Sequence, residues 1–331
     1  MMSLVPVRHP LLALALTVTI AACSPADVQP DTAAATALDS ASFAIVRDSA
    51  FRALVPEGAA ISEIASGLGF TEGPLWISRD GGWLLFSDLR ANALMRWVPD
   101  SGVTSWRSPS AGSNGNTLDV EGRIVTAQHD GQITRTDADG GVDTLVSAWD
   151  GHALSSPNDL VVKSDGTIWF TDPPYGLGDR TQATPGNYVY RFDPATGAVR
   201  PVVTDADRPN GLCFAPGEGT LYVADSGEPH HIRAFTVTGD SLSDGRVFAV
   251  IEPGAPDGIR CDEHGNVWTS SGDGAQIYAS DGALIARIML PQAAANLAFG
   301  GADGTTLYFT ARTSLYSMPT LVHDATQRQA R

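Results

Sequence analysis

The chain has 331 residues, 43% of them apolar, and a formal net charge of −16 at pH 7. That length and apolar content are enough for one large domain with an extensive core. The acidic balance argues against nucleic acid as a partner, because binding to a phosphate backbone needs a basic surface.

The first 23 residues have the features of an export signal. Arg8 precedes an apolar run over residues 11–20, which has the length of a signal-peptide core and is too short to span a bilayer. Small residues then stand before Cys23, which resembles the bacterial lipobox, so we expect a lipid on Cys23; an ordinary signal peptide cleaved nearby is the alternative. Ser24 follows, which favours the outer membrane. We therefore expect an exported protein on the periplasmic side that contacts a membrane only through this anchor.

Residues 24–53 are rich in Ala, Ser, Asp, Thr and Pro and show no sustained period. This composition predicts a flexible tether, within which a short helix over residues 39–52 is compatible with the sequence. We place the folded domain at residues 54–320, with a strand near residues 61–64 that helps to close it. Residues 321–331 are expected to form a loose tail.

The domain contains a repeated pattern in which a polar anchor residue opens a strand and a glycine turn leads to a second strand. In the copy from Asn158 to Asp172, the turn glycine Gly166 follows the anchor by eight residues. Successive anchors are 39 to 52 residues apart, and no helical pattern lies between them. The six anchors are Glu72, Asn114, Asn158, Asn210, Asp257 and Asn296. Such a period is typical of propeller blades, so we predict an all-β fold, a six-bladed β-propeller.

The anchors also predict a metal site. In a propeller the first strand of each blade lines the central channel, so the six anchors would form a ring about the axis. Burying so many amides and carboxylates without partners would cost several kcal/mol per group. Oxygen ligands that converge on an axis suit a hard divalent cation, calcium above all. Alternatively, each Asn or Asp only caps a turn, but six in register favour a central axial metal site.

Two further features lie near this ring. His129 ends a strand of the second blade, where a solvated or turn-bonded histidine is the ordinary interpretation and a substrate contact is the alternative. A long segment over residues 172–188 follows the second strand of the third blade and begins with two prolines. Long loops on rigid scaffolds tend to carry function, so we expect a lid or wall with Tyr175 pointing inward.

The two interior cysteines are predicted to be free thiols. Cys213 lies three residues after its anchor and Cys261 four residues after its own. Because side chains alternate along a strand, these two are expected to point to opposite faces.

Several motifs together closely resemble the bacterial gluconolactonase branch of the senescence-marker-protein, gluconolactonase and luciferin-regenerating-enzyme family. The likeness runs from about residue 60 to residue 318. The motifs are Thr71-Glu72-Gly73-Pro74, Ser156-Pro157-Asn158-Asp159, Thr171-Asp172-Pro173-Pro174-Tyr175-Gly176, Arg208-Pro209-Asn210-Gly211 and Ala255-Pro256-Asp257-Gly258.

The resemblance implies a propeller that hydrolyses sugar lactones with one divalent cation on its axis. By position, the resemblance makes Glu72, Asn158, Asn210 and Asp257 the expected metal ligands, with Asp257 also the general acid/base. Calcium is the expected cation, with zinc, magnesium and manganese as alternatives. The substrate, a small sugar lactone, is expected to contact Asn114, Asn158, His129, Tyr175 and Asn296.

Two other functions remain open on the same scaffold. One is a calcium-dependent arylesterase or organophosphatase. The other is a binding propeller without catalysis, in which calcium is structural. The sequence leaves the oligomeric state open.

Overall fold

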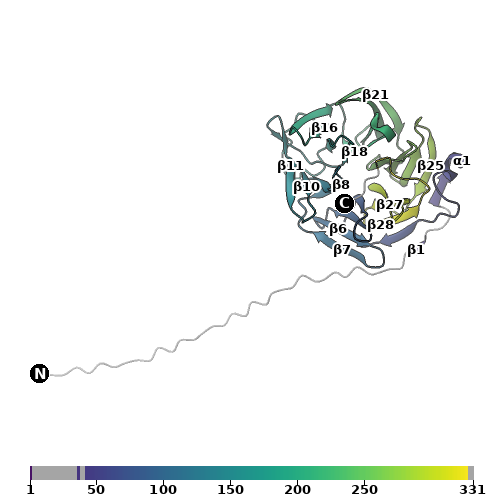
Figure 1. Cartoon of the computed structure of the whole chain (residues 1–331), viewed down its shortest axis with the longest axis horizontal. Helices are drawn as coiled ribbons and strands as arrows, with labels where there is room; N and C mark the ends of the chain where they lie inside the picture. Colours follow the sequence, from purple (N-terminus) through teal and green to yellow (C-terminus); the bar gives the residue numbers. More distant parts are fainter. Residues whose placement is uncertain (2–35, 38–41, 327–331) are drawn as a thin grey trace.

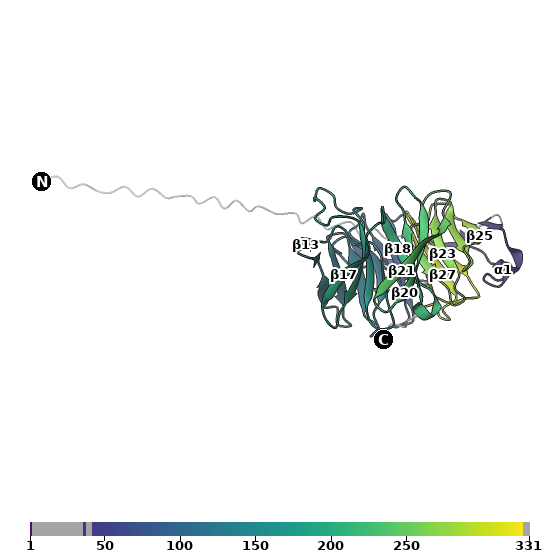
Figure 2. The same cartoon turned by 90° about the horizontal axis from the view of Figure 1, so that it is seen from above.

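A computed structural model describes residues 1, 36, 37 and 42–326 of the chain. Six antiparallel sheets surround a central axis as the blades of a propeller (Figure 1), and the side view shows a disc (Figure 2). This arrangement confirms the predicted all-β, six-bladed fold. Cys23 and the rest of the predicted signal peptide lie outside the described residues. No helix within the described ranges is long and apolar enough to cross a membrane.

In every blade the strands follow one another outward from the axis. The first three blades comprise β4 (Thr71–Ile77), β5 (Trp83–Asp88), β6 (Ala93–Val98) and β7 (Gly102–Arg107); β8 (Ser113–Leu118), β9 (Ile124–Gln128), β10 (Gln132–Thr136) and β11 (Val142–Val146); and β14 (Leu160–Val162), β15 (Ile168–Asp172), β16 (Tyr188–Asp193) and β17 (Ala198–Val203). A small hairpin of β12 (Ala148–Trp149) and β13 (His152–Ala153) lies between the second and third blades in sequence.

The other three blades follow the same plan. They comprise β18 (Pro209–Phe214), β19 (Thr220–Asp225), β20 (His231–Thr238) and β21 (Ser241–Val250); β22 (Ile259–Cys261), β23 (Val267–Ser271), β24 (Gly274–Tyr278) and β25 (Leu284–Met289); and β26 (Asn296–Gly300), β27 (Thr306–Ala311) and β28 (Ser314–Pro319). A 3₁₀ turn, η2 (Pro216–Glu218), connects β18 to β19.

The ring is closed by an N-terminal strand. β3 (Ser62–Ala65) pairs with β28 as the fourth strand of the sixth blade, so residues from both ends of the domain share one sheet. This confirms the expected strand near residues 61–64. β1 (Thr36–Ala37) then pairs with β3.

Part of the predicted tether is folded. β2 (Phe43–Ile45) pairs with β25, and α1 (Asp48–Arg52) follows it. The rings of Phe43 and Phe51 lie 5.4 Å apart, and Phe51 is buried in the cluster between the fifth and sixth blades. The domain therefore begins before residue 54, because two aromatic side chains in a polar stretch supply enough apolar surface to dock it.

The C-terminal segment also departs from expectation. Val322 is fully buried, and the backbone NH of Ala325 donates a hydrogen bond to the carbonyl of Cys261 at 2.9 Å. Asp262 and Asp324 form an isolated β-bridge. The prediction of a loose tail is therefore wrong for residues 321–326, which dock on the propeller; residues 327–331 lie outside the described residues.

Aromatic contacts hold neighbouring blades face to face. Trp169 of the third blade meets Phe214 of the fourth edge to face, with ring centroids 5.5 Å apart. Trp268 of the fifth blade meets Phe299 of the sixth at 5.5 Å in the same way. Each large apolar side chain buried in this way contributes about 1.5–3 kcal/mol. The packed ring fixes the innermost strands, and with them the anchor residues.

Candidate active site

A cavity of about 390 Å³ opens on the axis where the innermost strands begin, which we call the anchor end of the channel. All four predicted metal ligands line it, and three of the other predicted substrate residues do so as well. The lining residues are Phe70, Glu72, Leu89, Asn114, His129, Asn158, Tyr175, Asn210, Ser226, Ala255, Pro256 and Asp257.

Irregular backbone at the strand starts turns the anchors toward the axis. In β4, β8 and β18 a β-bulge lies at or beside the anchor, between Glu72 and Leu75 in the first case. In the third and fifth blades the anchor comes just before the regular strand. Bulges re-aim side chains at functional sites in this way. Backbone hydrogen bonds also join blades here, for example Gly115 NH to the Asn158 carbonyl at 2.8 Å and Gly211 NH to the Asp257 carbonyl at 2.9 Å.

Three anchors have buried oxygens without a hydrogen-bond partner among the described residues. They are Oδ1 of Asn114, Asn210 and Asp257. Buried polar atoms are nearly always paired, and each exception needs an explanation. Oxygen atoms that share one cavity and lack donors fit a hard cation, which would satisfy them together. The oxygen donors that line the cavity are two carboxylates, Glu72 and Asp257, and the Asn amides. The described residues contain no group of three or more His, Cys, Asp or Glu that could hold a metal.

The two carboxylates of the cavity are destabilised in their charged forms. Burial, together with the nearby carboxylate of Asp159, raises the pKa of Asp257 to about 7. Burial also raises the pKa of Glu72 well above its usual range, with a further rise from Asp257. Since an adjacent cation would favour both charged forms, the site has the electrostatic character of a cation site.

His129 lies in the cavity wall rather than in solvent. Its Nε2 is 2.8 Å from Asn114 Nδ2. Burial, together with the charge of the Arg180 guanidinium, lowers the pKa of His129 to about 4. A neutral imidazole can accept the hydrogen bond from Asn114 Nδ2, which leaves Asn114 Oδ1 facing the cavity without a partner.

The segment after β15 forms a second wall. Gly176 lies so close to the His129 ring that a Cβ atom would overlap it. Arg180 donates hydrogen bonds to the carbonyls of His129 and Gly176. Tyr175 lines the cavity as expected, and the guanidinium carbon of Arg208 lies 5.9 Å from its ring centroid.

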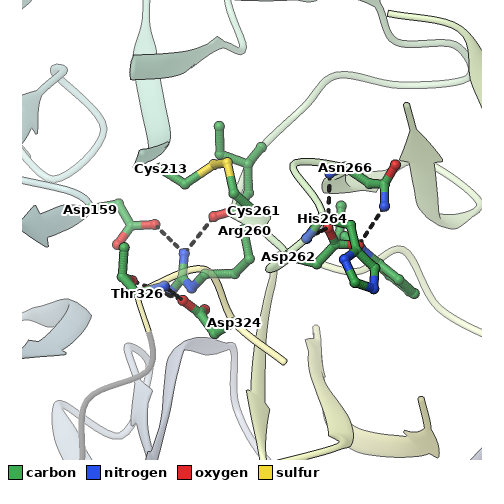
Figure 3. Close-up of a disulfide and its surroundings, with 11 residues drawn as sticks. Asp159, Cys213, Arg260, Cys261, Asp262, His264, Asn266, Asp324 and Thr326 are labelled. Carbon is green, nitrogen blue, oxygen red and sulfur yellow. Dashed lines mark hydrogen bonds and ion pairs between the residues drawn. A yellow bond between two sulfur atoms is a disulfide. The ribbon is translucent and has the colours of Figure 1, made fainter. Parts of the chain in front are cut away.

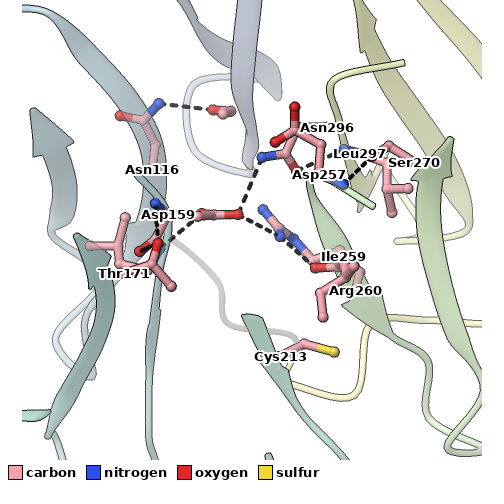
Figure 4. Close-up of polar contacts among 12 residues, drawn as sticks. Asn116, Asp159, Thr171, Cys213, Asp257, Ile259, Arg260, Ser270, Asn296 and Leu297 are labelled. Atoms are coloured by element: carbon pink, nitrogen blue, oxygen red, sulfur yellow. Dashed lines mark hydrogen bonds and ion pairs between the residues drawn. The ribbon is translucent and has the colours of Figure 1, made fainter. Parts of the chain in front are cut away.

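Asn296 does not line the cavity, although it belongs to the ring. Its Nδ2 is 3.2 Å from Asp159 Oδ2 and 3.4 Å from Glu72 Oε2 (Figure 4). Its amide therefore lies between two carboxylates, and this position does not support the expected direct contact with substrate.

The predicted free thiols are instead paired. Cys213 and Cys261 form a disulfide between β18 and β22, with Cα atoms 6.0 Å apart (Figure 3). The prediction was wrong because it assumed that side chains alternate regularly along the strand from each anchor residue. The bulge between Pro209 and Leu212 adds a residue to β18, and Asp257 precedes β22, so regular alternation does not hold across either segment.

Sequence reasoning also missed residues beside the anchors. Ser226 lines the cavity near Tyr175, and nothing in the repeat singles it out. Asp159 did leave a signal, because it occupies a position that is glycine in four of the six copies.

Comparisons with known proteins agree with this geometry. Residues 70–313 match the family described as the SMP-30/gluconolactonase/LRE-like region. The gluconolactonase of Zymomonas mobilis is 32% identical over 287 residues, which cover 76% of this chain and 78% of that protein. The pentonolactonase of Haloferax volcanii is 26% identical, with 72% and 80% covered. The solved gluconolactonase of Xanthomonas campestris is 35% identical, with a TM-score of 0.82 over 88% of this chain and 99% of that one. The protein belongs to the SMP-30/gluconolactonase/LRE-like family.

Proposed function

We propose that this protein is a lactone hydrolase that opens sugar lactones with the help of one divalent cation. The observation that carries the proposal is the axial cavity, in which two carboxylates converge with the amide oxygens of Asn114 and Asn210, which have no partner among the described residues. Relatives of the chain are named gluconolactonase, lactonohydrolase and pentonolactonase, which supports the lactone as substrate class.

Glu72, Asn158, Asn210 and Asp257 are the proposed ligands. A cation held by them would polarise the lactone carbonyl as a Lewis acid. Oxygen-only ligands favour calcium, whereas zinc prefers nitrogen and sulfur. Magnesium and manganese are the alternatives that share this preference for oxygen.

Asp257 is the proposed general base. Its backbone NH is held by Ser270 Oγ at 2.9 Å, and its Oδ1 has no partner among the described residues. One oxygen of this carboxylate can accept the proton of the attacking water, while the other would hold the cation. The same carboxyl group then returns the proton to the ring oxygen that leaves as the lactone opens.

The remaining walls fit a small polyol. Asn114, Asn158, His129 and Tyr175 are the proposed partners for the hydroxyl groups of the substrate. Phe70 and Pro256 provide apolar surface beside them. A volume of about 390 Å³ lies within the usual range for small-molecule sites.

The test is a panel of substrates assayed after chelation and after addition of calcium. We expect aldonolactones to be hydrolysed only with the cation. Faster turnover of aryl esters or phosphotriesters would support the arylesterase or organophosphatase alternative. Calcium-dependent lactone binding without turnover would support a binding propeller.

We also propose that the protein is exported and held by a lipid on Cys23, facing the periplasm from the outer membrane. The Cys213–Cys261 disulfide supports export, because disulfides persist in oxidising compartments such as the periplasm.

A further inference from the structure

An extra carboxylate lies just below the ligand ring. In four blades the residue after the anchor is a glycine, but in the third blade it is Asp159. Asp159 is fully buried, and the glycine of the second blade makes room for it: a Cβ atom on Gly115 would lie 2.6 Å from Asp159 Oδ1. The glycines at the equivalent positions are Gly73, Gly115, Gly211 and Gly258.

Asp159 is connected to a ligand by one amide group. Its Oδ1 accepts a hydrogen bond from Leu160 NH at 2.8 Å, and its Oδ2 accepts one from Asn296 Nδ2 at 3.2 Å. The same Nδ2 is 3.4 Å from Glu72 Oε2. Figure 4 shows the side chains of Asn296 and Arg260 both directed at the Asp159 carboxylate. The Asn296 amide therefore bridges Asp159 and Glu72, whose Oε2 also accepts a hydrogen bond from Gly73 NH at 3.0 Å.

Arg260 supplies the opposite charge. Its Nη1 is 3.5 Å from Asp159 Oδ2 and donates a hydrogen bond to the Ile259 carbonyl at 2.7 Å. Arg260 comes from β22, next to the Cys213–Cys261 disulfide (Figure 3). It also lines a second cavity, of about 210 Å³, at the opposite or far end of the channel. The ion pair thus lies between the two cavities.

Within the set of groups around Asp159, the charges balance once a divalent cation is counted. Glu72, Asp257 and Asp159 contribute three negative charges, Arg260 contributes one positive charge, and a divalent cation would contribute two more. The sum is zero. In a buried site with little solvent screening, an uncompensated charge is strongly unfavourable. Removal of one charged side chain therefore changes the affinity of the site for the cation.

We propose that Asp159 and Arg260 are positioning residues that set the cation affinity of the anchor end. Asp159 strengthens cation binding through its charge and through Asn296, which orients Glu72. Arg260 offsets that charge and so lowers the cation affinity. With a divalent cation bound, the net charge of these groups is then zero. This inference rests on the proposed cation-dependent function.

The test is a calcium titration by calorimetry on the full chain after chelation. Arg260→Met removes a positive charge, so calcium should bind about tenfold or more tightly. Asp159→Asn removes a negative charge with little change in volume, so calcium should bind about tenfold or more weakly. The double variant should return to within about threefold of the parent, because its net charge is restored.

Two controls separate charge from general damage. Arg260→Lys keeps the charge and should leave the calcium affinity near that of the parent. Arg123→Met breaks another ion pair, in which Nε lies 2.7 Å from Asp119 Oδ2 in the turn between β8 and β9. It should leave calcium affinity unchanged even if it lowers thermal stability.

The outcomes are distinguishable. Two results would overturn the role of the Asp159–Arg260 pair while the proposed function stands. In one, the parent binds calcium but both single variants bind it more weakly. In the other, the double variant binds calcium no more tightly than Asp159→Asn. If the parent binds no divalent cation, both fail. If Arg260→Met does not fold, the comparison of Asp159→Asn with the double variant still shows whether loss of the Arg260 charge raises or lowers calcium affinity.

Discussion

The two ends of the central channel are made by the same six innermost strands, yet they satisfy their polar groups differently. At the anchor end, Oδ1 of Asn114, Asn210 and Asp257 has no partner within the described part of the chain, and two carboxylates have raised pKa values. At the far end, the Asp262 carboxylate accepts hydrogen bonds from His264 NH, Asn266 and the Trp268 indole.

The far end is also covered. The docked residues 321–326 and the Cys213–Cys261 disulfide lie there, and Ala325 packs against the cluster that contains both cysteines. The contrast teaches that the fold completes its own hydrogen bonding and covalent bonding at one end and leaves oxygens available at the other. A ligand site belongs where the oxygens are left available.

The largest expected effect comes from Asp257→Asn at the anchor end. The change keeps the volume and one oxygen but removes the proposed proton acceptor. With calcium binding verified as saturated, turnover should fall by roughly two to four orders of magnitude. Asn210→Ala is the control, since it removes a neutral ligand and excess calcium should restore most of its activity. Near-parental turnover of Asp257→Asn at saturation would make Asp257 only a ligand and His129 the next candidate base.

Loss of the far-end disulfide, which carries no charge, should act on stability alone. Replacing both cysteines, as Cys213→Ser with Cys261→Ser, removes a cross-link between residues 48 apart in sequence. The free energy of unfolding should fall by about 2–4 kcal/mol. Urea denaturation measures the loss, and calorimetry should show a calcium affinity within about threefold of the parent. A large loss of calcium affinity would show that the disulfide also supports the cation site.

Calcium should stabilise the anchor end. A cation relieves the repulsion between Glu72 and Asp257 and satisfies the unpartnered oxygens, so it favours the folded state. At about one hundred times its dissociation constant, the free energy of unfolding should rise by about 2.7 kcal/mol. Thermal melts with chelator and with excess calcium measure this. In Glu72→Gln the calcium-dependent rise should shrink; an equal rise in that variant would exclude Glu72 as a ligand.

Acid should weaken the wall of the cavity through His129. Its pKa is about 4 in the folded protein and 6.5 when unperturbed, so between these values the unfolded chain binds more protons. The contribution of His129 to the free energy of unfolding therefore falls as the pH falls from about 6.5 to 4, by about 1–2 kcal/mol after allowance for partial exposure. Urea denaturation of the parent and of His129→Asn across this range should show this fall in the difference between their free energies of unfolding. A difference that does not change with pH would mean that His129 is not the group responsible.

These comparisons also show what the sequence could and could not predict. The six anchors were readable because one polar residue recurs at the start of each inner strand, and this placed Glu72, Asn158, Asn210 and Asp257 in one cavity. The sequence does not show how far along the axis each anchor side chain lies, so Asn296 was expected to contact substrate. The disulfide was missed because a bulge interrupts the alternation in β18. The docked segment at residues 43–53 was missed because its few apolar residues do not form a period.

Cys23→Ser is expected to have the smallest effect on activity and calcium affinity. If Cys23 carries the lipid, this variant should leave the membrane fraction and partition into the aqueous phase of a detergent separation. Its kcat/KM on aldonolactones and its calcium affinity should stay at the parental values, because a tether outside the propeller changes neither end of the channel. The variant lacking Cys213 and Cys261 is the matched control: it loses stability but should still partition with detergent. Mass spectrometry of the parent decides the chemistry, since an unmodified chain that begins at another residue would reject lipidation and leave an ordinary cleaved signal peptide as the explanation.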